Sequence, residues 1–259
     1  MNATTLTATA ARAPRTDARP RLARLTAVEL RKMINTRAGF WLQLAVVVLT
    51  VAIVVVTCLF ADPKDQTLRS MLSIAVQPAS VLLPIVGILL VTSEWSQRTG
   101  LITFALVPRR PRVVAAKLLA AVVSSVVALA LCLVVAAIGT AVAAPGVEHT
   151  WSLPAGLLGQ DAVYVVTAMI GGVAFGAALL ASAPAIVLSF VLPIGWSIVN
   201  RIAGLDAAGR WLDGSRTLSA MTEHVMSPTE WARAGTTLAL WMVLPLLIGL
   251  WRITRGEIR

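Results

Sequence analysis

The sequence predicts an all-α membrane protein with six transmembrane helices, and its composition and charge pattern carry that prediction. Hydrophobic residues make up 58% of the 259 residues and charged residues only 13%, whereas about 25% of a soluble domain is charged. The mean hydropathy is +0.83. A helix needs about 20 apolar residues to cross a hydrocarbon core of roughly 30 Å. Five runs without Asp, Glu, Lys or Arg meet or approach this length: 38–61, 70–93, 118–147, 162–200 and 234–251. A soluble enzyme, a disordered chain and a coiled coil are thereby excluded.

The N-terminal region divides into a tail and a basic helix. Residues 1–25 are rich in Ala, Thr, Arg and Pro and lack the apolar run of a secretory signal. They predict a disordered tail, with an organelle transit peptide as the alternative. Over 26–39, Thr26 is a candidate N-cap and Glu29 completes a capping box. The polar residues Glu29, Arg31 and Lys32 make this an amphipathic helix that we expect in the headgroup layer; otherwise the segment is a charged flank.

The first three runs each predict one membrane-spanning helix. The first span covers 40–60 and starts with Phe40 and Trp41, which are typical interfacial anchors. The second covers 71–92, where Pro78 and Pro84 predict a kink. The third covers 118–143, after a basic loop at 94–117.

The last two runs predict three further spans. At 1.5 Å per residue, the 39 residues of 162–200 would reach about 58 Å as one helix, so we expect two spans that meet near 182–184. Gly172 and Gly176 have the spacing of a closely packed helix pair. The sixth span covers 235–251. Before it, a loop at 201–233 ends in Ser227-Pro228-Thr229-Glu230, which predicts a helix start. Residues 26–259 are thus expected to form a single six-span transmembrane domain.

The distribution of charges predicts the orientation in the membrane. With six spans, the N-terminus, the 94–117 loop, the 182–184 turn and the C-terminus share one side, which carries a net charge of +12 against −2 on the other. The positive-inside rule then places both termini in the cytoplasm and leaves the 201–233 loop external or re-entrant. The net charge of +10 is explained by orientation, so no nucleic-acid partner is expected.

No enzymatic motif accompanies these spans. The sequence contains no P-loop, no HExxH and no GxSxG, so we expect neither an enzyme nor a metal or cofactor site in this chain. The predicted spans also contain no charged residue of the kind that couples transport to ions. Candidate residues of a substrate pathway are Gln77, Thr92, Ser189, Trp196 and Asn200. For Ser and Thr, the alternative is a hydrogen bond to a backbone carbonyl or a neighbouring helix.

The most informative segment is the 94–117 loop. Its residues Glu94-Trp95, Thr99-Gly100, Leu106, Pro108, Arg109 or Arg110, Arg112 and Lys117 resemble the pattern of ABC-2 type permeases, the six-span membrane subunits of bacterial ABC exporters. Upstream, Glu29-Leu30-Arg31-Lys32 is similar to the amphipathic elbow helix of that family.

The resemblance implies a function and its partners. It implies an ATP-driven exporter subunit in the bacterial cytoplasmic membrane that moves a lipophilic or amphipathic drug, antibiotic or lipid outward. Two partners would complete the exporter. One is a separate ABC ATPase dimer, which would hold ATP and Mg²⁺, and the other is a second permease copy or a paralogue. The expected docking residues for the ATPase are Glu94, Trp95, Arg98, Thr99, Gly100 and Phe104. The alternatives are a non-transporting assembly or sensor subunit and a glycan exporter.

Overall fold

The computed structural model describes residues 21–62, 66–96, 110–143, 150–202, 209 and 211–255. Six helical segments in this part of the chain are long and apolar enough to cross a membrane, which confirms the predicted number of spans. The first five are α2 (Arg37–Phe60), α3 (Leu68–Ser96), α5 (Arg110–Ala143), α6 (Ala155–Leu179) and α7 (Ser182–Ile202). The sixth is continuous through α10 (Pro228–Leu238), a π-helical turn (Ala239–Val243) and α11 (Leu244–Arg255). Two shorter helices are α1 (Leu22–Asn35) and α9 (Gly214–Glu223).

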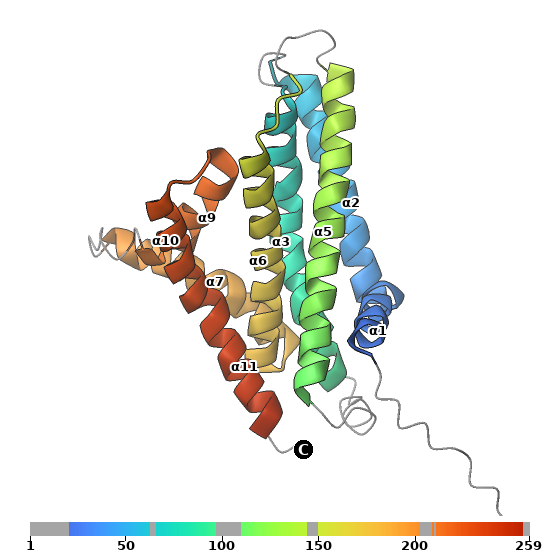
Figure 1. The fold of residues 1–259 in the computed structure, drawn as a ribbon, viewed down its shortest axis with the longest axis vertical. Helices are drawn as coiled ribbons and strands as arrows, with labels where there is room; N and C mark the ends of the chain where they lie inside the picture. The colour runs from blue at the N-terminus through green and yellow to red at the C-terminus, as the bar shows by residue number, and fades with distance from the viewer. Residues whose placement is uncertain are drawn as a thin grey trace, which may run out of the picture.

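The long helices form an upright group with a splayed side. In Figure 1, α2, α3, α5 and α6 run side by side, while α7 and the α10–α11 segment lean away from them. Helix α1 lies across the foot of the group, at the end where α5 starts and α11 finishes. Helices α9 and α10 pack against each other at the far end of α7 and α11, partway along the bundle.

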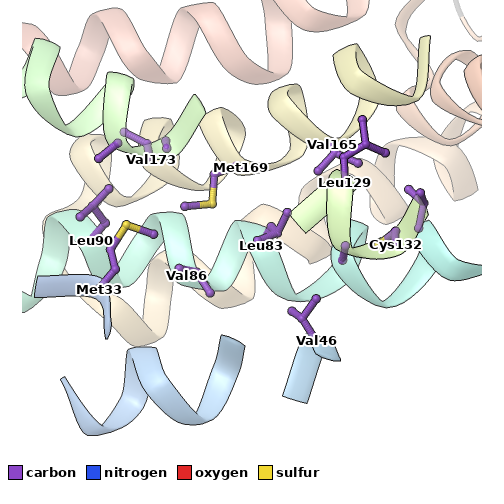
Figure 2. Packing of buried hydrophobic residues seen from close by; sticks show 14 of the residues in the cluster. Met33, Val46, Leu83, Val86, Leu90, Leu129, Cys132, Val165, Met169 and Val173 are labelled. Atoms are coloured by element: carbon purple, nitrogen blue, oxygen red, sulfur yellow. The ribbon is translucent and has the colours of Figure 1, made fainter. Parts of the chain in front are cut away.

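Helix α3 is the centre of the core. It packs against α2, α5, α6 and α7, and its residues Leu72, Val76 and Leu83 are at most 2% exposed. Figure 2 shows how the other helices contribute: Met33 comes from α1, Val46 from α2, and Leu129 and Cys132 from α5. Helix α6 adds Val165, Met169 and Val173. Both Pro78 and Pro84 lie inside α3, which continues through them as one helix.

The contact between α3 and α6 is a close backbone approach. A Cβ atom placed on Gly172 would overlap the carbonyl oxygen of Pro84, and one on Gly176 would lie 3.0 Å from the carbonyl oxygen of Ile88. On the other side of the contact, a Cβ on Gly87 would lie 2.5 Å from the carbonyl oxygen of Met169. The predicted role of the Gly172-xxx-Gly176 spacing is therefore confirmed: small residues let the two backbones meet.

The first helix starts earlier than predicted. Helix α1 begins at Leu22, and Thr26 lies inside it, where the Thr26 Oγ1 donates a hydrogen bond to the Leu22 carbonyl oxygen at 3.1 Å. The N-cap assignment of Thr26 and the capping box with Glu29 are wrong, because good helix formers at 22–25 extend the helix. It ends at Asn35, and Thr36 caps α2 by accepting a hydrogen bond from the Gly39 backbone N–H.

Two other boundary predictions are confirmed. The 162–200 run breaks into α6 and α7 at Leu180 and Ala181, and Leu180 adopts the left-handed conformation with φ 55°. Its backbone N–H donates to the Gly176 carbonyl oxygen at 2.8 Å. At the start of α10, Ser227 and Glu230 form the predicted capping box, in which the Ser227 backbone N–H donates to Glu230 Oε2 at 2.7 Å.

The helices are longer than the charge-free runs. Arg69 lies in the first turn of α3, Glu94 in its last turn, Lys117 inside α5 and Asp161 inside α6. The expectation that the spanning helices contain no charged residue is therefore wrong for the helices as folded. An apolar run measures only the part of a helix that can contact hydrocarbon, whereas the helix continues wherever its end groups find partners.

Candidate functional site

Four charged side chains meet where α1, the end of α3 and the start of α5 come together. Helix α1 supplies Glu29 and Lys32, which are three residues apart and so share one face. Helix α3 supplies Glu94 from its last turn, and α5 supplies Lys117. We call these four residues the inner ion cluster. It brings together positions up to 88 residues apart in the sequence.

The cluster alternates positive and negative groups. Lys117 Nζ lies 2.7 Å from Glu29 Oε2 and 3.1 Å from Glu94 Oε1. Lys32 Nζ lies 2.7 Å from Glu29 Oε1 and 2.7 Å from Glu94 Oε1. Lys117 Nζ also donates to the Leu90 carbonyl oxygen at 2.9 Å, so each of its three protons has an acceptor. Both oxygens of Glu29 are engaged, and Glu94 Oε1 is shared by the two lysines.

The cluster is electrically balanced and largely hidden from water. The side chains of Glu29, Glu94 and Lys117 are 6%, 7% and 5% exposed, whereas that of Lys32 is 41% exposed. Burial of the Lys32 ammonium lowers its pKa, but the hydrogen bonds to Glu29 and Glu94 and their charges outweigh this, so the pKa of Lys32 is raised above its usual value. Removing one member of a buried ion pair costs about 3–5 kcal/mol, because the other charge remains in place.

The position of the cluster determines what it can do. Glu94, in α3, lies three residues before the 97–109 segment, and Lys117, in α5, lies eight residues after it. Their ion pair therefore joins the two helices on either side of that segment. Both are also joined to α1 through Glu29 and Lys32. A displacement of α3 relative to α5 at this end would therefore strain contacts that α1 shares. The arrangement suits mechanical coupling between helices.

A second polar site lies at the other end of α3 and α6. Arg69 Nη1 lies 2.5 Å from Asp161 Oδ2, and Asp161 is completely buried. The second guanidinium nitrogen of Arg69 donates to the Thr222 carbonyl oxygen at the end of α9. Gln160 Nε2 donates to the carbonyl oxygens of Met221, at 3.0 Å, and His224, at 2.7 Å. We call Arg69, Gln160 and Asp161 the outer clamp, since they fasten the 221–226 segment to α6 and α3.

The expected docking residues are only partly within the described chain. Glu94 and Trp95 form the last turn of α3, rather than the start of a separate cytoplasmic helix. Glu94 is engaged by the two lysines. The remaining docking residues, Arg98, Thr99, Gly100 and Phe104, lie outside the described residues. Of the interfacial-helix residues, Arg31 is exposed, unlike Glu29.

The five pathway candidates are spread along two helices. Gln77 is exposed on α3, and Thr92 is buried fifteen residues further on, which corresponds to about 22 Å of helix. The Thr92 hydroxyl donates to the Ile88 carbonyl oxygen at 2.9 Å and lies 2.7 Å from Ser182 Oγ. Ser189, on α7, donates to the Ile186 carbonyl oxygen at 2.9 Å. Thr92 and Ser189 thus make the carbonyl and interhelix contacts that we gave as the alternative.

The other two candidates share an unusual feature. On α7, Trp196 Nε1 and Asn200 Oδ1 are both buried and have no hydrogen-bond partner among the described residues. Such groups are costly to leave unpaired. They are the two pathway candidates that remain open to a ligand or a partner.

Sequence reasoning missed the outer clamp and did not give Lys117 a role beside Glu29. The signal was present: Arg69 and Asp161 each stand directly before a charge-free run, at 70–93 and 162–200. Because α3 and α6 start at the same end of the bundle (Figure 1), residues at the starts of these two runs lie at a similar depth. Likewise Glu94 ends one run and Lys117 precedes the next.

Neither a comparison with protein-family models nor one with curated proteins finds a match. The similarity to ABC-2 permeases therefore rests on the residues of the 94–117 loop and of α1, together with the span count. Among the described residues, no three His, Cys, Asp or Glu side chains gather as metal ligands would.

Proposed function

We propose that this chain is the membrane-spanning permease subunit of an ATP-driven exporter of the ABC-2 type. Its substrate would be a lipophilic or amphipathic small molecule moved out of a bacterial cell. A separate ABC ATPase dimer would supply the energy. The inner ion cluster is the observation that carries the proposal, because it ties the loop expected to meet an ATPase to the helices expected to move.

Fold stability alone does not explain why four charged residues meet in a largely buried cluster. Apolar residues of similar volume often stabilise a fold as well as a buried ion pair does. The inner ion cluster, however, connects α1 to both helix ends that flank the 97–109 segment. A force applied to that segment by a cytoplasmic partner would reach α1, α3 and α5 together. A transport subunit without an ATP-binding motif needs such a route, because the force that moves its helices must come from a partner.

The proposed orientation follows from charge. The end of the bundle that holds α1, the start of α5 and the end of α11 (Figure 1) is the one with the +12 net charge by sequence. The positive-inside rule makes this end cytoplasmic, and α1 would then lie in the headgroup layer with Arg31 toward water and Met33 in the core. The inner ion cluster would stand at the membrane surface, where a partner could reach it.

The second permease copy would meet this chain through exposed apolar helix faces. The pairing helices would be the first, second and fifth spans, which are α2, α3 and α7. Of these, α3 is the most buried within the chain, while α2 and α7 expose most of their apolar side chains. Trp196 Nε1 and Asn200 Oδ1, which have no hydrogen-bond partner in the part of the chain that the structure describes, lie on α7. The second copy or the substrate would meet polar groups there.

The test is reconstitution with an ABC ATPase encoded beside this chain. We expect the two proteins to copurify and lipophilic compounds to stimulate ATP hydrolysis in proteoliposomes. Glu94→Gln should preserve assembly and basal hydrolysis but lower both substrate stimulation and efflux about tenfold. Glu223→Gln, at the end of α9 and outside the cluster, is the matched control and should behave as wild type.

Three outcomes would contradict the proposal in different ways. If no ATPase copurifies, the partner assignment is wrong. If a complex forms but no compound is transported, the chain is an assembly or sensor subunit. If Glu94→Gln transports as well as wild type, the inner ion cluster has no coupling role.

A further inference from the structure

A groove runs between α2 and α5 on the outside of the bundle, with α3 as its floor. Its volume is about 360 Å³. The deepest lining residues, Val46 on α2 and Leu83 on α3, are 3% and 2% exposed, whereas Phe40 and Val127 at the rim are 48% and 63% exposed. From Phe40 to Val47 on α2 the lining spans seven residues, which is about 10 Å. The groove is thus narrow, elongated and open to the surroundings of the helices.

The polar groups of the groove are gathered at one end. Its two polar lining residues are Gln43 on α2 and Ser124 on α5. Ser124 is 8% exposed, and neither side chain has a hydrogen-bond partner among the described residues. Gln43 lies within one turn of Phe40, and Ser124 is the first α5 residue in the lining. Beyond them, toward Val47 and Leu131, the lining is apolar.

Positive charge continues the polar end of the groove. Arg37 precedes Phe40 by three residues on α2, and Arg31 precedes Ile34 by three residues on α1, so each shares a helix face with a lining residue. Both arginines are exposed. The nearest carboxylate on α1, Glu29, is already engaged by Lys32 and Lys117. Within the described part of the chain, Arg31 and Arg37 thus give the mouth of the groove positive charge that no ion pair neutralises.

From this arrangement we infer that the groove binds one anionic phospholipid. An acyl chain lies along the apolar part over Leu83, and the ester oxygens accept hydrogen bonds from Gln43 and Ser124. The phosphate rests against the guanidinium groups of Arg31 and Arg37. A helix of a second copy, about 10 Å wide, does not fit a volume of about 360 Å³, whereas part of a single acyl chain does. The inference does not depend on the proposed exporter activity.

The experiment measures lipids retained by the whole chain in detergent. Native mass spectrometry would follow titration with phosphatidylglycerol and with phosphatidylcholine of the same acyl chains. We expect one phosphatidylglycerol to be retained with a preference on the order of tenfold, since basic residues near the surface attract anionic headgroups. The double variant R31Q/R37Q should bring the preference close to one. R201Q/R216Q removes the same charge from α7 and α9 and should leave it unchanged.

A second pair of variants tests the groove itself. Ala128→Phe should fill the groove and abolish retention of both lipids. Val127→Trp, at a more exposed wall position, should weaken retention if Ala128→Phe does not fold. Equal preference in R31Q/R37Q and R201Q/R216Q would overturn the headgroup assignment. Undiminished retention in a folded Ala128→Phe or Val127→Trp, or loss of a dimer rather than of lipid, would overturn the groove as a lipid site.

Discussion

The two ends of helix α3 are held in the bundle by different sets of contacts. At one end, the inner ion cluster joins side chain to side chain, with four charges that sum to zero. At the other, the outer clamp combines the Arg69–Asp161 ion pair with bonds to backbone, in which Arg69 and Gln160 donate to carbonyl oxygens of 221–224. Side-chain ions can exchange partners while staying paired, whereas a hydrogen bond to a carbonyl fixes one backbone position. Because the outer clamp has more bonds to backbone, we expect it to be the more rigid of the two ends.

The largest expected effect comes from the contact that both ends share. Gly172→Leu would place a side chain against the Pro84 carbonyl oxygen and separate α3 from α6. Because α3 carries Glu94 and Arg69 and α6 carries Asp161, both ends should fail together. We expect loss of monodisperse protein in size-exclusion chromatography. Gly171→Leu is the matched control, since nothing lies within 4 Å of a Cβ at Gly171; similar behaviour of the two variants would refute the close-contact explanation.

The second largest expected effect concerns the inner ion cluster alone. Lys117→Met leaves two buried carboxylates with only Lys32 and should cost about 3–5 kcal/mol, which lowers the thermal midpoint by on the order of 10 °C. Adding Glu29→Gln to Lys117→Met should recover part of this loss, because one unpaired charge is removed. A midpoint equal to that of wild type for Lys117→Met would show that the cluster is not coupled as its distances indicate.

Asp161→Asn should have a smaller and more local effect. Arg69 would keep its bond to the Thr222 carbonyl oxygen, and the new amide oxygen could still accept from the guanidinium. We expect a loss of about 1–3 kcal/mol, as for a weakened buried hydrogen bond. Hydrogen exchange should rise in 214–226 and stay unchanged in α1. Faster exchange in α1 as well would mean that the two ends are not independent.

The smallest effect concerns the exposed member of the inner ion cluster. The pKa of Lys32 is raised in the folded chain by its carboxylate partners, despite the opposing effect of burial. The stabilisation it contributes is therefore complete below its unfolded pKa, near 10.5, and is lost as the pH rises through the folded pKa. Wild type should lose thermal stability above about pH 10.5, and Lys32→Met should lose less over the same range. An identical pH dependence in both proteins would exclude Lys32 as its source.

Much of the fold is a local property of the sequence. The six spans, the break before α7 and the capping box at Ser227 follow from apolar runs, helix length and neighbouring residues. The predicted start of α1 was wrong for an equally local reason. A residue that often caps helices, such as Thr26, is also tolerated inside a helix when its hydroxyl bonds to the preceding turn. A helix boundary thus depends on the residues on both sides of a motif as well as on the motif itself.

The site was only partly within reach of sequence reasoning. Glu29, Lys32 and Glu94 stand out individually, by their places in a basic helix and at the end of a span. Their pairing with Lys117 depends on how α1 crosses the bundle, which no local pattern specifies. The same holds for Asp161: its neighbours in sequence suggest a loop, and only its contact with Arg69, 92 residues away, explains why it is buried.

The unequal helix lengths make the apolar belt of this molecule uneven. On α5 the exposed large apolar residues run from Leu119 to Val142, which is about 35 Å of helix; on α7 they run from Val187 to Ile202, which is about 23 Å. Since α7 also leans (Figure 1), its height along the membrane normal is smaller still. A bilayer of uniform thickness near 30 Å cannot match both faces. Hydrophobic mismatch would therefore favour thinner membrane, or another protein, beside α7.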